Sequence, residues 1–554
     1  MATISALQKA RASYMPKLPK SLAKHGPFVK VEEGNATAPS ADQAALKERF
    51  PNTYGLPMAS ITQAAGDGTS EPLKIGVILS GGQAPGGHNV IAGLYDAVKA
   101  VNSDSELYGF LGGPSGLVEN KYCKLTGDII DRYRNTGGFD IIGSGRTKLE
   151  TEEQFDKVAA TCREHGIHGV VVVGGDDSNT NACMLAEYFL ANNIDIQVIG
   201  CPKTIDGDLK NEQIPIPFGF DTATKVYSEL IGNILSDVNS AKKYWHFIRV
   251  MGRSASHIAL ETALQTQPNI TIVSEEVEQE GTTLNDIVYQ IADTVRRRAE
   301  DGKNFGVAII PEGLIGFIPQ INSLISELNE LLANNEEQFK SLQSAEENCE
   351  FVSGKLSADA AEAFTSLPQD IQMQLLLDRD PHGNVQVSRI ETEKLLSSMV
   401  DHQLKEWKDQ GRFKGKFSPQ HHFFGYEGRA AAPSNFDADY CYTLGYTAAT
   451  LINARKTGYI AAVGNLTAPA PEWTAAGVPL TMMMNMERRH GGDKPVIERA
   501  LVELDGKPFQ QLKQNRESWK TEDDYVLPGP IQYFGPSEVC DRITETLRLE
   551  QQSG

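Results

Sequence analysis

The sequence predicts an α/β protein whose core is an open sheet of buried strands. Short apolar runs recur along the chain, and most of them open into loops rich in glycine and charged residues. Helical patterns follow many of these loops, so the chain repeats a unit of strand, loop and helix. Such repetition is typical of an α/β sheet rather than of an all-α or all-β chain.

The stretch between residues 174 and 210 contains the clearest pair of these units. The apolar run Val170–Val173 leads into Gly-Gly-Asp-Asp, and Ile196–Ile199 leads toward Lys-Thr-Ile-Asp-Gly-Asp. Because the carboxyl-end loops of neighbouring parallel strands form a crevice, we expect a charged ligand there. The aspartates suit a metal ion and proton transfer, and the glycines admit a phosphate. A tight turn is the alternative for 174–178 alone, but Lys203 between the two halves favours a ligand site.

Length and charge limit what the chain can bind. Its 554 residues exceed a single ordinary core, so about three domains are expected. The formal net charge of −20 opposes nonspecific nucleic-acid binding, which needs a basic field. An anionic ligand would also be repelled unless cations converge locally. No run of about 18 apolar residues occurs, so no membrane span is expected.

The cysteines and the N-terminal residues indicate a cytoplasmic protein. The seven cysteines are odd in number and never form a C-x-x-C pair, which favours reduced thiols over a zinc site or a disulfide framework. Residues 1–31 carry lysines but no acid, as a transit peptide would. Pro16, Pro19 and Pro27 interrupt any amphipathic helix there, so an ordered arm over the surface is expected.

Residues 1–73 are expected to form an N-terminal extension with one helix, Ala41–Phe50, and a Gly/Thr/Ser-rich link at 66–70. The globular pattern begins at Lys74 with a strand to Leu79, a glycine loop over 80–89 and a helix to Val101. The amides of this loop and the helix N-terminus can hold an anion. The glycine spacing fits neither a P-loop nor a dinucleotide fingerprint.

Further strands and helices alternate along the chain. Strands are predicted at Leu107–Leu111, Phe247–Val250, Asn269–Val273, Asn304–Ile310 and Tyr459–Asn465, and helices at Glu152–His165, Thr222–Ser240 and Ile258–Leu264. Arg146, Arg253 and Arg429 stand at strand ends or in glycine turns, where a guanidinium can reach a phosphate. An exposed side chain beside Glu150 or Glu152 is the alternative for Arg146. His257 is expected to pack or cap rather than act as a base.

The segment 319–419 differs in character, because it is helical in pattern and has few glycines. We expect a helical insertion whose charge runs are solvated faces. The adjacent His421 and His422 have no carboxylate or cysteine at metal-binding spacing, so no metal site is predicted there. The methionines 482–484 are expected to fill the core. From about Pro495 onward the sequence offers no clear chemistry.

Five motifs occur in a fixed order along the chain. They are Gly81-Gly82-x-x-Pro85-Gly86-x-x-Asn89, Gly174-Gly175-Asp176, Pro202-x-Thr204-Ile205-Asp206-x-Asp208, Met251-Gly252-Arg253 and Pro311-Glu312-Gly313. Together they resemble the motifs of the phosphofructokinase family, over about residues 74–490 apart from the insertion. The Thr-Ile-Asp-x-Asp box is highly specific, since kinases that share only a Gly-Gly-Asp-Gly loop lack it.

Two positions depart from the ATP-using pattern of that family. ATP-using members usually have glycine where this chain has Asp177 and Lys203, and both residues resemble the pyrophosphate-dependent branch. Residues 251–257 and 425–429 are similar to the long form of that branch. A carboxylate at 177 would lie where the α-phosphate of a nucleotide lies, so repulsion and bulk would exclude ATP but not pyrophosphate.

The resemblance implies two Rossmann-like doubly wound lobes with the active site between them. It also implies a division of the chain. The expected parts are 1–73, an N-terminal extension; 74–217, a pyrophosphate-binding lobe completed by about 434–490; 218–318, a fructose-6-phosphate-binding lobe; 319–419, the helical insertion; and 420–554, a return segment completing both lobes.

The implied reaction is a reversible, Mg²⁺-dependent transfer of a phosphoryl group from pyrophosphate to the 1-hydroxyl of fructose 6-phosphate. By resemblance, Asp176 ligates Mg²⁺ and Asp206 accepts the hydroxyl proton, with Asp208 assisting the carboxylate or the metal. Lys203 and Arg146 neutralise the moving phosphoryl group.

The remaining implied roles concern substrate binding. The implied contacts are Gly81 and Gly82 with pyrophosphate, Thr204 with the substrate, Met251, Gly252, Arg253 and Glu312 with the sugar, and Tyr426 and Arg429 with its 6-phosphate. Lys243 and Tyr244 are implied to reach the sugar phosphate of a neighbouring subunit, so at least a homodimer with shared active sites is expected. The alternatives are an ATP-dependent phosphofructokinase and a non-catalytic regulatory subunit, which Asp176, Asp206 and Asp208 argue against.

Overall fold

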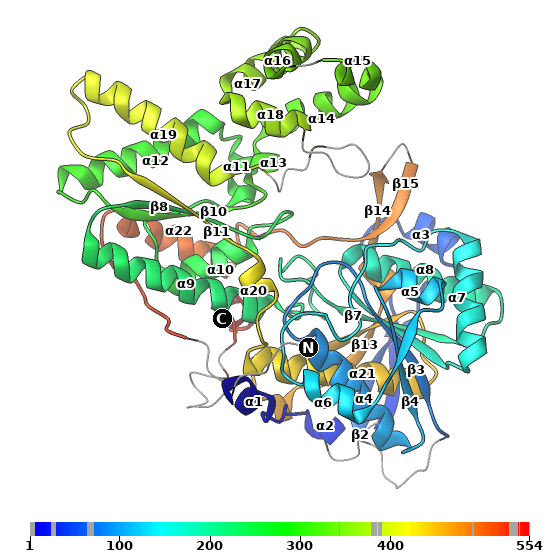
Figure 1. The fold of residues 1–554 in the computed structure, drawn as a ribbon. Helices are drawn as coiled ribbons and strands as arrows, with labels where there is room; N and C mark the ends of the chain where they lie inside the picture. The colour runs from blue at the N-terminus through cyan, green and yellow to red at the C-terminus, as the bar shows by residue number, and fades with distance from the viewer. Residues whose placement is uncertain are drawn as a thin grey trace. The chain divides into compact units, whose positions relative to one another are not determined.

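The computed structural model describes residues 6–23, 29–63, 71–342, 344–377, 385, 390–489, 492–530, 541 and 543–552. The chain divides into two compact units, which Figure 1 shows coloured along the sequence. Unit 1 comprises Met1–Val226, Tyr426–Ala500 and Ile531–Gly554, and unit 2 comprises Tyr227–Gly425 and Leu501–Pro530. Each unit contains a sheet and helices, which confirms the α/β class; the predicted domain limits remain predictions. The predicted link at 66–70 lies outside the described residues.

Unit 1 is built on a nine-stranded mixed sheet with the order β1-β2-β13-β12-β7-β6-β3-β4-β5. The strands from β12 to β4 run parallel, and antiparallel strands flank them on both sides. The central strands are continuous apolar runs because both of their faces are buried. The bounds are β1 Val29–Ala36, β2 Pro57–Gln63, β3 Lys74–Leu79, β4 Glu106–Phe110, β5 Tyr122–Leu125, β6 Gly169–Gly174, β7 Gln197–Pro202, β12 Tyr459–Gly464 and β13 Thr474–Pro479, with a separate hairpin of β14 Met484–Arg489 and β15 Gly492–Ile497.

Helices cover both faces of this sheet. Successive strand residues face opposite sides: Val170 packs with side chains of α7 and α8, whereas Gly169 faces Ile452 of α21. The helices α4 and α21 cross closely, since a Cβ on Gly93 would come within 2.2 Å of the Tyr442 carbonyl oxygen. The helix bounds in unit 1 are α1 Ala6–Ala12, α2 Lys20–Ala23, α3 Gln43–Arg49, α4 Gly87–Val101, α5 Pro114–Val118, α6 Gly127–Tyr133, α7 Glu152–His165, α8 Asp176–Ala191, α20 Tyr426–Arg429, α21 Asn435–Asn453 and α24 Glu545–Gln551, with short 3₁₀ turns at Ala470–Glu472 and Leu480–Met483.

Two strands of the N-terminal extension, β1 and β2, form part of this sheet, and the sequence analysis did not predict them. The strands β1 and β2 pair with each other, and β2 continues the sheet through β13. The strand β1 is mostly exposed and carries lysine and glutamate, so it lacks the apolar run that predicts a strand. The predicted helix Ala41–Phe50 is confirmed as α3. Near Arg146 the chain forms no strand and makes one bridge, from Gly145 to Ser80.

Unit 2 is built on a four-stranded parallel sheet with the order β11-β8-β10-β9. Trp245 and Phe247 of β8 project into its hydrophobic core. The helix α9 begins in unit 1 and continues into unit 2. The bounds are α9 Phe220–Ala241, β8 Trp245–Val250, α10 His257–Thr266, β9 Ile270–Thr271, α11 Ser274–Glu280, α12 Leu284–Glu300, β10 Gly306–Pro311, α13 Leu314–Phe317, β11 Pro419–Phe424 and α22 Lys507–Trp519.

The segment 319–419 is helical in its described residues, as predicted. It is not a separate globule, because Leu328, Phe364 and Leu396 share one apolar cluster with Trp245 and Phe247 of the sheet. The insertion therefore completes the core of unit 2. Its helices are α14 Pro319–Asn334, α15 Glu336–Lys340, α16 Ala345–Ser353, α17 Ala358–Ser366, α18 Gln369–Leu377 and α19 Thr392–Asp409.

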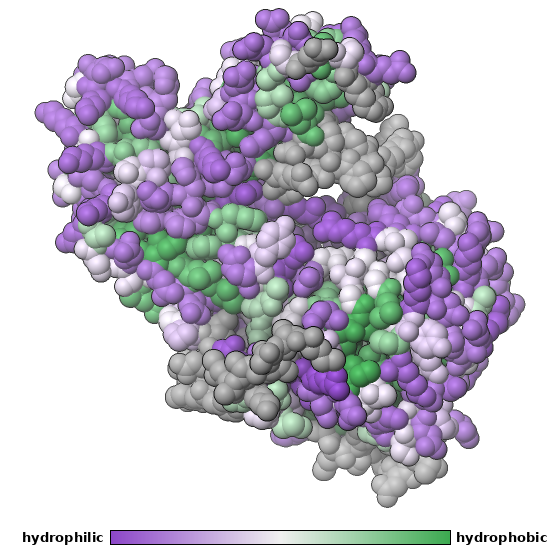
Figure 2. All heavy atoms as spheres, in the orientation of Figure 1, coloured by the Kyte–Doolittle hydropathy of each residue, from purple (hydrophilic) through white to green (hydrophobic). Residues whose placement is uncertain are grey.

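Hydrophilic residues predominate on the outer helices of both units on the face that Figure 2 shows, as the net charge of −20 suggests. In the part of the chain that the structure describes, no helix is long and apolar enough to cross a membrane.

Candidate active site

The glycine loop after β3 lies at the carboxyl end of the central strands of unit 1. The Ser80 amide donates to the Val173 carbonyl at 2.8 Å, and the Gly81 amide donates to the Gly145 carbonyl at 2.9 Å. Gly81 has a φ of 84°, a left-handed conformation that favours glycine. These bonds fix the backbone that precedes α4.

Two cations lie against this loop. A Cβ on Gly81 would lie 3.3 Å from the Lys203 ammonium, and a Cβ on Gly82 would lie 3.5 Å from Cζ of Arg429. Both glycines therefore leave room for a positive side chain to approach the backbone. Arg429 also stacks on the ring of Tyr426, with 5.1 Å between Cζ and the ring centroid, although Tyr426 is largely exposed.

The loop after β6 places two aspartates at the start of α8. Asp176 is partly buried and Asp177 is exposed. Asn179 stabilises this turn, since its side-chain amide donates to the carbonyls of Gly174 at 2.7 Å and Gly175 at 2.9 Å. The turn that carries the aspartates is thereby fixed before any ligand binds.

The loop after β7 carries Lys203, Thr204, Asp206 and Asp208. The Asp206 amide donates to the Thr204 hydroxyl oxygen at 3.0 Å, which forms a tight turn. Lys203 is bonded through its own amide to the Gly174 carbonyl at 3.0 Å, so the loops after β6 and β7 are tied together. The predicted crevice residues are therefore adjacent, as the strand-end argument requires.

Burial and crowding shift the titration of two of these groups. Burial lowers the pKa of the Lys203 ammonium to about 8, although Asp206, Asp176 and Asp208 oppose that shift. Burial raises the pKa of Asp208 to about 7, and the neighbouring Asp206 and Asp176 raise it further. The loops thus hold a weakly hydrated cation among closely spaced carboxyl groups.

One cation at this site was not predicted from the sequence. The Nε of Arg499 lies 2.7 Å from Oδ2 of Asp176, and Arg499 also opposes the pKa rise of Asp208. Arg499 follows β15, in the segment where the sequence offers no clear chemistry. Its sequence neighbourhood gives no signal, because the contact joins residues 323 positions apart.

Arg146 lies beside the glycine loop. Its neighbour Gly145 bonds to the glycine loop, which places the Arg146 backbone beside that loop, but the side chain is exposed.

Unit 2 brings together four of the residues predicted to contact the sugar. Met251, Gly252 and Arg253 follow β8, and Glu312 follows the neighbouring strand β10. The Gly313 amide donates to the Gly252 carbonyl at 3.1 Å, and a Cβ on Gly313 would come within 2.2 Å of the Arg253 carbonyl oxygen. The two strand-end loops are therefore in contact.

Lys243 and Tyr244 lie at the other end of the same strand. They precede β8, whereas Met251 follows it, and a strand of six residues spans about 20 Å. Tyr244 is 37% exposed. Within one chain these two residues therefore cannot join the cluster at Met251.

Comparison with known proteins identifies the family of this chain. The family model described as Phosphofructokinase matches residues 74–353. The chain belongs to the phosphofructokinase family. It is 58% identical over 547 residues to the pyrophosphate–fructose 6-phosphate 1-phosphotransferase of Porphyromonas gingivalis, with 99% of both chains covered. It is 51% identical to subunit beta 1 of the Arabidopsis thaliana enzyme of that name, with 99% of this chain and 94% of the relative covered.

A solved structure with the phosphofructokinase fold is also similar. The pyrophosphate-dependent phosphofructokinase from Nitrosospira multiformis has a TM-score of 0.53 and 16% sequence identity, and the match covers 86% of this chain and 96% of that chain. At this identity the likeness shows the fold alone.

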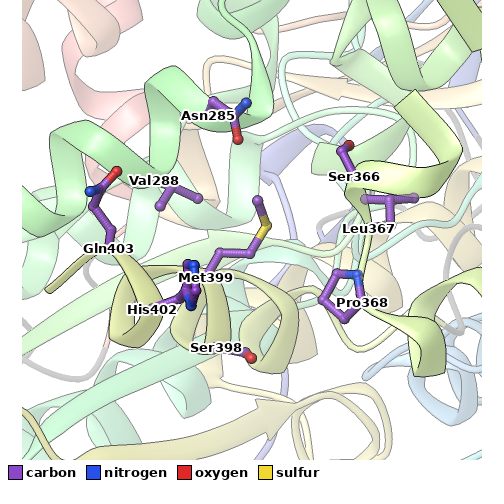
Figure 3. A pocket seen from close by; sticks show the side chains of 9 residues that line it. All are labelled: Asn285, Val288, Ser366, Leu367, Pro368, Ser398, Met399, His402 and Gln403. Carbon is purple, nitrogen blue, oxygen red and sulfur yellow. The ribbon is translucent and has the colours of Figure 1, made fainter. Parts of the chain in front are cut away.

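A cavity in unit 2 is separate from the predicted phosphofructokinase chemistry. It has a volume of about 360 Å³, and Met399 of α19 extends into its centre (Figure 3). It is lined by Asn285, Val288, Ser366, Leu367, Pro368, Ser398, Met399, His402 and Gln403. None of the predicted site residues is among them, and the lining has no lysine, arginine or carboxylate to hold a phosphate or a metal.

Proposed function

We infer that this chain transfers the terminal phosphoryl group of pyrophosphate to the 1-hydroxyl of fructose 6-phosphate, giving fructose 1,6-bisphosphate and phosphate. The observation that carries this inference is the buried Lys203 ammonium against the Gly81 backbone, at a position where ATP-using relatives usually have glycine. The names of relatives that match over the full length of the chain support the same donor and acceptor.

The donor is held by the loops of unit 1. The backbone of Gly81 and Gly82 and the N-terminus of α4 attract the anionic pyrophosphate. The Lys203 ammonium lies against the backbone of Gly81, and Arg429 adds a second positive charge beside Gly82. The net charge of −20 would repel an anionic substrate, and these two cations attract it locally.

The carboxylates fit a magnesium ion that arrives with the donor. Among the described residues no three acidic, histidine or cysteine side chains form a ready metal cage. Mg²⁺ in phosphoryl transfer needs only one or two carboxylates together with phosphate oxygens, and Asp176 is close enough to Asp208 to raise the pKa of that carboxyl group. When bound there, Mg²⁺ would neutralise charge on the phosphate oxygens.

Asp206 acts as the general base. Its carboxylate accepts the proton of the 1-hydroxyl as the hydroxyl oxygen forms a bond to the terminal phosphorus and the bond from phosphorus to the bridging oxygen breaks. Burial and the neighbouring Asp206 raise the pKa of Asp208 to about 7, so the two carboxyl groups lie close together at the site of proton transfer. Lys203 stabilises the charge on the transferring group and on the leaving phosphate.

The sugar phosphate is assigned to the residues predicted to contact it. Met251, Gly252, Arg253 and Glu312 form the contiguous strand-end cluster of unit 2, and we assign the sugar ring to it. The prediction that Tyr426 and Arg429 hold the 6-phosphate is kept, although Arg429 lies beside the donor loop in this conformation.

Lys243 and Tyr244 are assigned to a neighbouring subunit's site. Their position at the far end of β8 supports this assignment, because they cannot serve the cluster at Met251 in their own chain. A homodimer or larger homo-oligomer with shared sites is therefore proposed, together with a cytoplasmic location.

The experiment that tests the function offers purified protein fructose 6-phosphate and Mg²⁺ with either pyrophosphate or ATP. We expect fructose 1,6-bisphosphate to form with pyrophosphate alone. Turnover with ATP and none with pyrophosphate would establish the ATP-dependent alternative. No turnover with either donor would favour the regulatory-subunit alternative.

A further inference from the structure

Arg499 lies next to the carboxylates of the loops after β6 and β7. Its guanidinium Nε donates to Oδ2 of Asp176 at 2.7 Å. The Asp176 and Asp208 carboxyl groups and the exposed Asp177 all contribute to keeping the pKa of Arg499 above its ordinary value, although burial opposes them. Arg499 thus adds a positive charge among the carboxyl groups of the loops after β6 and β7.

The backbone around Arg499 is fixed to the same loops. The Glu498 amide donates to the Met483 carbonyl at 3.0 Å, and the Ala500 amide donates to the Asp208 carbonyl at 2.8 Å. The side chain is nevertheless 38% exposed, so part of the guanidinium faces solvent where a ligand can reach it. A fixed backbone with a partly open planar cation is a suitable arrangement for recognising a phosphate.

The charge of Arg499 has two opposite consequences for the ligands of this site. A guanidinium on the Asp176 carboxylate repels a bare divalent cation and reduces the negative charge available to it. The same guanidinium attracts an anionic phosphate and can form two parallel hydrogen bonds with its oxygens.

We propose that Arg499 is a donor-binding residue that pairs with Asp176 and contacts a pyrophosphate oxygen when the donor binds. This proposal rests on the proposed function, because it takes Asp176 as the metal ligand and pyrophosphate as the donor. Arg499 disfavours a divalent ion alone and favours the ion together with pyrophosphate. The metal and the donor therefore enter the site together.

The test is the Arg499→Gln variant, measured in two ways. First, Mn²⁺ binding without any substrate is followed by electron paramagnetic resonance; we expect Mn²⁺ to bind several-fold more tightly, because a neighbouring positive charge is lost. Second, steady-state kinetics are measured with pyrophosphate; the KM for pyrophosphate should rise about 10- to 100-fold, the loss typical of a charge-assisted hydrogen bond. The KM for fructose 6-phosphate should change by less than about threefold.

Two further variants serve as controls. Arg455→Gln breaks an exposed ion pair with Asp195 and should change neither quantity. Arg499→Lys retains the charge and should recover part of the pyrophosphate affinity; it also keeps the test open if the glutamine variant does not fold.

An unchanged KM for pyrophosphate, or weaker rather than tighter Mn²⁺ binding in the glutamine variant, would overturn the proposal. The second result would mean that Arg499 only holds Asp176 in place. If the parent protein shows no turnover with pyrophosphate, the proposed function fails instead. Equilibrium dialysis of radiolabelled pyrophosphate with parent and variant then decides the role of Arg499 separately.

Discussion

Replacing Lys203 by methionine should lower activity and raise stability at the same time. The side chain is only 7% exposed, and burial lowers the pKa of its ammonium from 10.5 to about 8. At about 1.4 kcal/mol for each tenfold change in proton affinity, the charged ammonium costs the folded protein about 3 kcal/mol. Methionine has a similar length and carries no charge, so it removes that cost.

The same charge is expected to stabilise the transition state. Single donors at comparable sites contribute about 2–4 kcal/mol, so Lys203→Met should lower kcat with pyrophosphate about 30- to 900-fold. Lys203→Met also removes the buried ammonium from the folded state. The free energy of unfolding at pH 7 should therefore rise by up to about 3 kcal/mol.

The assay combines turnover with pyrophosphate and urea unfolding of the substrate-free protein. Lys157→Met serves as the matched control, because Lys157 lies on α7 in an exposed pair with Glu153 and should change stability by less than about 0.5 kcal/mol. A Lys203→Met protein that keeps kcat within threefold of the parent would refute the catalytic role. One that is less stable than the parent would refute the charge-burial argument.

The remaining predictions concern proton transfer and pH. Asp206→Asn should lower turnover by at least about 10²-fold while calorimetry still detects fructose 6-phosphate binding; unchanged turnover would remove Asp206 as the base. The value of kcat/KM for pyrophosphate should fall above pH 8 as Lys203 loses its proton, and Lys203→Arg, which stays charged, should lack this fall. Burial raises the pKa of Asp439 from 3.8 to about 7, so its carboxyl group binds a proton more tightly in the folded protein than in the unfolded chain. Protonation of Asp439 therefore stabilises the folded protein at acid pH, and this stabilisation is lost as the pH rises from about 4 to about 7. The melting temperature of Asp439→Asn, relative to the parent, should therefore increase across that interval; a constant difference would contradict the shift.

The strands and helices with strong local signals could be predicted from the sequence. The strand β3 matches its predicted bounds because both of its faces are buried and every position after Lys74 is apolar or small. The helix α7 matches because a capping box formed by Thr151 and Gln154 fixes its start. The site loops could be predicted for a similar reason, since glycine and aspartate directly follow buried strands.

Other features depend on contacts that no local pattern contains. The strand β1 is an exposed edge strand, so charged residues replace the apolar run that would reveal it. The insertion helices look independent in sequence, yet Phe364 packs in the same core as Trp245. Arg499 follows a hairpin and has no motif around it; only the folded chain brings it to Asp176.

The most direct test measures whether Asp177 and Lys203 determine which phosphoryl donor the protein uses. ATP binding and turnover should be measured in the parent and in the double variant Asp177→Gly with Lys203→Gly. We predict that the parent neither binds nor uses ATP, and that the double variant binds ATP while its turnover with pyrophosphate falls. A double variant that still does not bind ATP would contradict the claim that Asp177 excludes the nucleotide.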